Sequence, residues 1–186
     1  MKRIRLPFFV LTILFFVIAF LERVAFDLGP NVELVTLVML LASVYLGKQK
    51  ALGLVFAVML ASDLVLGNTK IFIFTWSGFM IPVFVVNYLV GKFGSINKVI
   101  LGTGMGIGAN LFFYGWTNFG VWFLDGWGMY ANDLGGLIQC YVNGLPFLKL
   151  QLTSTLLFVP LGFGLWELVS GFSLLWQGRR PYNWIE

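Results

Sequence analysis

The sequence predicts an all-α membrane protein, a compact bundle of about six transmembrane helices with a short amphipathic helix on the outer side. Hydrophobic residues make up 59% of the chain and charged residues 11%, whereas roughly 25% of residues are charged in a typical soluble domain. Mean hydropathy is +0.90. The apolar residues form runs close to the length of about 20 residues that crosses a bilayer. At 186 residues the chain is expected to form one integral membrane domain, residues 1–186.

The apolar runs define the expected helices in chain order. They cover residues 6–26, 32–46, 51–66, 71–90, 98–117 and 150–176. In the first helix the continuous apolar stretch stops before Glu22 and Arg23. A signal peptide would need small residues at this point, so we interpret the segment as an uncleaved helix. Pro82 and Pro160 lie inside two of the runs and are expected to kink those helices.

Residues 134–145 have helical periodicity but are too short to cross a bilayer. Asp133 is expected to cap this short helix and Pro146 to end it. We therefore expect it to lie at the outer membrane interface. Its apolar face would carry Leu134, Leu137, Ile138, Tyr141, Val142 and Leu145, and the opposite face Gly135, Gly136, Gln139, Cys140, Asn143 and Gly144.

The basic residues predict the orientation. If the N-terminus is cytoplasmic and six spans alternate, nine basic residues fall on the cytoplasmic side and three on the outer side. This asymmetry follows the positive-inside rule and predicts a bacterial inner-membrane protein with both termini in the cytoplasm. The cytoplasmic set is Lys2, Arg3, Arg5, Lys48, Lys50, Lys92, Lys98, Arg179 and Arg180, and the outer set is Arg23, Lys70 and Lys149.

The run over residues 98–117 carries glycines at alternate positions, Gly102, Gly104, Gly106 and Gly108. Pairs of small residues four apart let another helix approach closely, so we interpret these glycines as helix-packing positions. They follow no strand and precede no P-loop lysine, which argues against a phosphate-binding loop.

Polar side chains gather toward the outer ends of the predicted helices. Because uncharged polar groups and carboxylates are costly in hydrocarbon, they are expected to face the bundle interior. They could simply join the helices by hydrogen bonds, or they could line a water-accessible pocket with aromatic walls, the usual design for a small ligand. The second interpretation makes Asn31, Glu33, Asp63, Asn110, Tyr114, Asn118, Trp122, Gln139 and Asn143 the candidate ligand-binding residues.

Several classes of function find no support in the sequence. The chain has no histidine and one cysteine, Cys140, which we interpret as a small apolar filler. This excludes catalysis by histidine and leaves no common set of metal ligands. We expect no enzyme activity, no cofactor and no nucleic-acid partner, since the basic residues are explained by topology.

Four segments resemble an uncharacterised family of small bacterial membrane proteins that is similar to the substrate-binding S components of energy-coupling-factor (ECF) transporters. They are Pro30–Glu33, Ser62–Asp63, Asn118–Trp122 and Gly136–Phe147. The resemblance implies a six-helix protein that captures a small solute or micronutrient from outside, with a transmembrane coupling subunit and ATPases as partners. S components usually carry alanine-rich small residues on the first helix, but here Ala19 is the only small residue from Leu6 to Leu21.

Two rival interpretations remain open. A membrane scaffold would bind other proteins through its apolar helices and would need no pocket. An intramembrane enzyme would need a pair of aspartates at mid-depth, and only Asp63 is near such a position.

Overall fold

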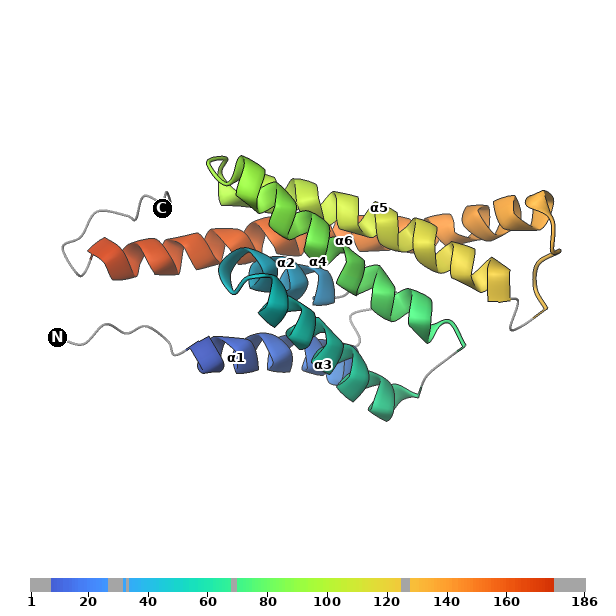
Figure 1. Cartoon of the computed structure of the whole chain (residues 1–186), viewed down its shortest axis with the longest axis horizontal. Helices are drawn as coiled ribbons and strands as arrows, with labels where there is room; N and C mark the ends of the chain where they lie inside the picture. Colours follow the sequence, from blue (N-terminus) through green and yellow to red (C-terminus); the bar gives the residue numbers. More distant parts are fainter. Residues whose placement is uncertain (1–7, 27–31, 33, 68–69, 125–127, 176–186) are drawn as a thin grey trace.

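A computed structural model describes residues 8–26, 32, 34–67, 70–124 and 128–175. Within these ranges the chain folds into α-helices and one π-helical turn (Figure 1). Five helices are long and apolar enough to cross a membrane, and a sixth is shorter. The elements are α1 (Phe8–Leu21), the π-helix η1 (Glu22–Phe26), α2 (Val35–Tyr45), α3 (Lys48–Leu66), α4 (Phe72–Phe93), α5 (Lys98–Leu124) and α6 (Leu134–Leu175).

The helices alternate in direction along the bundle (Figure 1). The start of α1, the start of α3, the start of α5 and the end of α6 lie toward one end of the molecule. Lys48 begins α3, Lys98 begins α5 and Lys92 lies in the last turn of α4, so these three basic side chains belong to that same end. This arrangement agrees with the alternation that the charges predict.

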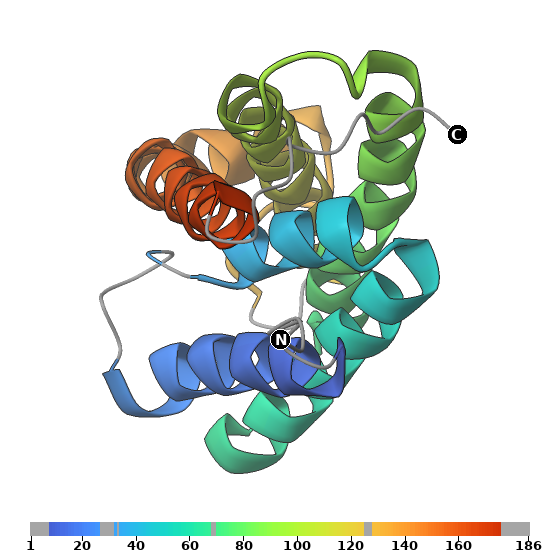
Figure 2. The same ribbon diagram turned by 90° about the vertical axis from the view of Figure 1, so that its left-hand side faces the viewer.

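The short helix α2 lies at the centre of the bundle (Figure 2). It contacts all five other α-helices, and eight of its 11 residues are buried. A helix that is apolar on all sides is stable where other helices surround it. Because α2 is enclosed by protein, its 11 residues need not match the thickness of a bilayer.

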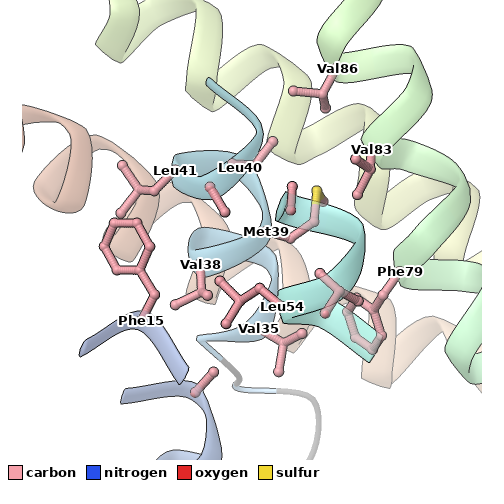
Figure 3. Packing of buried hydrophobic residues seen from close by; sticks show 14 of the residues in the cluster. Phe15, Val35, Val38, Met39, Leu40, Leu41, Leu54, Phe79, Val83 and Val86 are labelled. Atoms are coloured by element: carbon pink, nitrogen blue, oxygen red, sulfur yellow. The ribbon is translucent and has the colours of Figure 1, made fainter. Parts of the chain in front are cut away.

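Apolar side chains from several helices close around α2 (Figure 3). Met39 and Leu40 of α2 are fully buried, and Leu54 of α3, Val83 of α4 and Phe15 of α1 pack in the same cluster. The rows of apolar residues on α1, α3 and α4 that face away from this cluster are exposed in the isolated chain. Such outward apolar surfaces suit a hydrocarbon surrounding.

The prediction of a separate short helix over residues 134–145 is wrong. Residues 134–175 form one helix, α6, with Pro146 and Pro160 inside it. Pro146 removes the helical donor to the Val142 carbonyl, but α5 packs along α6 and donates hydrogen bonds to its backbone on both sides of the proline, which holds the two halves together. The Tyr114 hydroxyl donates to the Tyr141 carbonyl at 2.6 Å, and the Asn110 amide donates to the Gln151 carbonyl at 3.0 Å.

The start of α6 has the predicted cap. The Asp133 carboxylate accepts a hydrogen bond from the Gly136 backbone N–H at 2.8 Å, as an N-cap residue does. Gly136 is required there, because a Cβ would lie 1.9 Å from the backbone oxygen of Ala131.

Several helix ends also differ from the predicted bounds by three residues or more, among them the start of α2 and the end of α4. α5 continues to Leu124, seven residues beyond the predicted end at residue 117, and α3 begins at Lys48 instead of residue 51. The apolar run did not mark the start of α3, because the first turn of α3 is polar and exposed, and it did not mark the end of α5, because polar and glycine residues there face other helices. Thr117 and Gly120, for example, are both buried.

Candidate functional site

A hollow of about 480 Å³ lies between α5, α6, the start of α4 and the segment at residues 129–130. We call it the α5–α6 hollow. Its volume is within the range of about 300–1,000 Å³ that is usual for small-molecule sites. The residues that line it are Ile71, Thr75, Phe113, Tyr114, Thr117, Asn118, Val121, Met129, Tyr130, Asn143, Gly144, Phe147, Leu148 and Gln151.

Three of the predicted ligand-binding residues meet at this hollow: Tyr114 and Asn118 from α5, and Asn143 from α6. Tyr114 and Asn118 are one helical turn apart and therefore share a face of α5. The Asn118 amide donates to the Tyr114 carbonyl at 2.8 Å. Asn143 lies across from them on α6 and donates to the Tyr130 hydroxyl at 3.4 Å.

A stripe of small residues lets α6 approach α5 at the hollow. Gly136, Cys140 and Gly144 are spaced four apart and all are buried. A Cβ at Gly144 would lie 2.4 Å from the Asn118 side-chain oxygen, and the Cys140 thiol donates to the Asn118 carbonyl at 3.3 Å. Sequence analysis placed these three residues on a polar face, although their small-xxx-small spacing was the signal for a packing face.

Two tyrosines fasten α5 and α6 to each other beside the hollow. Tyr114 donates to the Tyr141 carbonyl at 2.6 Å, and Tyr141 in return donates to the Gly115 carbonyl at 2.9 Å. Both hydroxyl protons are therefore committed to the backbone. These side chains fix the shape of one wall.

Gln151 was not among the predicted ligand-binding residues, yet it lies at the hollow and is 3% exposed. Its side-chain nitrogen Nε2 has no hydrogen-bond partner among the described residues. A buried amide N–H without a partner costs free energy, and such groups are rare in folded proteins. The position of Gln151 at the start of a predicted span gave no sign of this, because its surroundings come from α5.

Asn110 does not line the hollow but lies beneath it, 1% exposed. Its amide nitrogen donates to the Gln151 carbonyl and to the Thr155 hydroxyl, the latter at 2.6 Å. Its amide oxygen accepts from the Thr36 hydroxyl at 3.3 Å. Asn110 thus joins α2, α5 and α6 through buried hydrogen bonds, and it holds the backbone of Gln151.

We expect Asn110→Leu to reduce the free energy of unfolding by about 2 kcal/mol, since hydrogen bonds between membrane helices contribute about 0.6 kcal/mol each and Leu must also fit a site shaped for an amide. SDS titration in mixed micelles measures the change. Asn87→Leu is the control, because the Asn87 amide donates only within its own helix, to Val83. Equal losses in the two variants would contradict the role of Asn110.

Asp63 lies in a different cluster, which the sequence did not predict. One carboxylate oxygen pairs with the Arg23 guanidinium of η1 at 3.1 Å, and the other accepts from the Trp76 indole N–H of α4 at 2.6 Å. Arg23 also donates to the Ser62 hydroxyl at 2.9 Å. The cluster connects η1, α3 and α4, and its charges compensate one another.

The remaining predicted residues lie elsewhere. Gln139 is exposed on α6. Trp122 donates its indole N–H to the Ala131 carbonyl at 3.0 Å, and so holds the segment before α6 against α5. Asn31 and Glu33 lie outside the described residues. Near them, the buried Glu22 carboxylate accepts the Leu34 backbone N–H at 2.9 Å, just before α2 begins.

The alternating glycines of α5 divide into two pairs. Gly102 and Gly106 are buried where Phe163 of α6, Thr155 of α6 and Leu40 of α2 approach. Gly104 and Gly108 are exposed and have no neighbouring atom within 4 Å of an added Cβ among the described residues. The second pair lines an apolar groove of about 510 Å³ between α4 and α5.

Within the described residues, no group of three or more Cys, Asp or Glu side chains could hold a metal ion. Comparison with protein-family models matches residues 2–175 to a family of unknown function, DUF6580. No curated protein and no solved structure matches the chain.

Proposed function

This chain belongs to a family of unknown function, DUF6580, and we propose that it is a multi-span membrane protein that binds a small solute in the α5–α6 hollow. The observation that carries the proposal is the meeting of Tyr114, Asn118 and Asn143 at a hollow of about 480 Å³. These side chains come from two helices and are separated by up to 29 residues in sequence. Aromatic walls with a few polar groups are the usual composition of a small-molecule site.

The proposed role is that of a substrate-binding subunit similar to the S component of an ECF transporter. It would capture a solute or micronutrient from outside a bacterial inner membrane, with both termini in the cytoplasm. The even alternation of helices and the basic residues Lys48, Lys92 and Lys98 at one end support this orientation. No phosphate-binding motif occurs in the sequence. Uptake would therefore need a coupling subunit and ATPases as partners.

The test is to fill the hollow. Asn143→Trp puts a bulky ring at a position that lines it, whereas Val142→Trp puts the same ring on the neighbouring exposed position of α6, which does not line it. The protein is purified in mild detergent, and small molecules that co-purify are identified by mass spectrometry. We expect the bound species to be present in the wild type and in Val142→Trp and absent from Asn143→Trp, because only that ring takes the space of the solute.

The same experiment distinguishes the rival function. The apolar groove that Gly104 and Gly108 line between α4 and α5 favours a membrane scaffold, because small residues on an open face let a helix of another protein approach. A scaffold would retain its protein partner in Asn143→Trp and would carry no solute in any variant. Identical small-molecule content in wild type and Asn143→Trp would refute solute binding in the hollow.

A further inference from the structure

The described residues that line the α5–α6 hollow include none with a charge. Two basic residues adjoin lining residues in the sequence, Lys70 and Lys149, and both are exposed and do not contribute to the lining. The cluster around Asp63 already combines its carboxylate with Arg23 and Trp76. A charged solute buried among aromatic and amide groups would lose its hydration without an opposite charge to replace it, which is very costly.

Most hydroxyl groups of the hollow are occupied by the protein itself. The Thr75 hydroxyl donates to the Phe72 carbonyl, the Thr117 hydroxyl to the Phe113 carbonyl, and the Tyr114 hydroxyl to the Tyr141 carbonyl. The Gln151 amide differs from them, since its Nε2 is buried and unpartnered within the described part of the chain. It is therefore a buried donor on a lining residue that the described part of the protein leaves without an acceptor.

The backbone of Gln151 is held independently of its side chain. Its carbonyl oxygen accepts from the Asn110 amide at 3.0 Å. The side chain therefore starts from a fixed backbone position, and the aromatic residues Phe113 and Phe147 line the same hollow. Flat apolar groups pack well against aromatic rings, which favour stacked or edge-to-face contacts.

We infer that the solute is an uncharged molecule with a flat apolar body and a carbonyl-type oxygen that accepts a hydrogen bond from Gln151 Nε2. This inference rests on the proposed function and specifies its substrate class. The uncharged lining selects against anions and cations, the rings accommodate the body, and Gln151 fixes its orientation.

The experiment compares three probes that share one ring system: 2-naphthamide, 2-naphthoate and 2-naphthylmethylammonium. Full-length protein is placed in lipid nanodiscs, and probe binding is measured by equilibrium dialysis. Binding to nanodiscs that hold Asn143→Trp is subtracted, which removes partition into lipid. We expect the neutral amide to bind at least tenfold more tightly than either charged probe.

Gln151→Met removes the amide and keeps the length of the side chain. We expect it to weaken 2-naphthamide binding about tenfold, the usual effect of one lost hydrogen bond to a buried partner. Gln139→Met is the matched control, an exposed glutamine on the same helix, and it should leave binding unchanged. Thermal unfolding of both variants verifies that the bundle is intact.

Equal or tighter binding of a charged probe, or unchanged amide binding in Gln151→Met, would overturn the inferred class while leaving solute binding in place. Failure of all three probes to bind would also overturn it. The proposed function fails separately, when no co-purifying small molecule depends on Asn143.

Discussion

Asp63→Ala is expected to reduce the free energy of unfolding by about 3 kcal/mol, the lower end of the usual cost of removing one partner from a buried ion pair, because this pair is partly buried. The Asp63 and Arg23 side chains are 11% and 19% exposed. The substitution removes the carboxylate from the Arg23 guanidinium and also removes the acceptor of the Trp76 indole N–H. The loss combines a broken ion pair with an unsatisfied indole donor, so it should exceed that of an ordinary surface substitution.

Two comparisons make this prediction specific. Asp133→Ala removes an aspartate that only caps a helix, and it should cost about 1 kcal/mol. The double variant Arg23→Met, Asp63→Leu removes both charges and should be more stable than Asp63→Ala, because apolar side chains then replace the whole ion pair. SDS titration in mixed micelles measures all three. The interpretation is wrong if Asp63→Ala costs no more than Asp133→Ala.

Gly102→Leu is expected to destabilise the bundle by about 3 kcal/mol, the upper part of the usual range for overpacking a core. A Cβ at Gly102 would lie 2.8 Å from the Phe163 ring. Phe163 is fully buried, so its ring cannot move aside without displacing α6. Even a Cβ atom at Gly102 would therefore push α5 and α6 apart.

Gly104→Leu provides the matched comparison on the same helix. An added Cβ there meets no described atom within 4 Å, so we expect a change within about 0.5 kcal/mol, as at an exposed position. Thermal midpoints in detergent can be measured for both variants side by side. Similar losses at the two glycines would show that the cost reflects glycine itself and not its neighbours.

The four glycines of α5 show what residue spacing can and cannot predict about helix packing. Spacing predicted that helices pack on it, and Gly102 and Gly106 lie where α2 and α6 approach. Spacing did not distinguish them from Gly104 and Gly108, because both pairs obey the same four-residue rule. The distinction depends on which neighbouring helix covers each face.

The polar residues of α5 show the same limit, because equal spacing does not reveal which neighbouring helix surrounds each side chain. Asn110, Tyr114 and Asn118 follow one face at helical spacing, and their spacing left open whether they join helices or line a pocket. In the structure Asn110 is enclosed by Thr36 and Thr155, while Tyr114 and Asn118 reach the hollow. The partners of Asn110 come from α2 and α6, so nothing in α5 alone could identify them.

By itself, the sequence determined that the chain is helical and that several of its segments are long and apolar enough to cross a bilayer, because these features belong to each segment separately. Tertiary structure alone decided that residues 134–175 form one helix, that Asp63 pairs with Arg23, and that Gln151 lies at the hollow. Hydrogen bonds and close packing depend on atoms from other segments, and their geometry exists only once the helices have assembled.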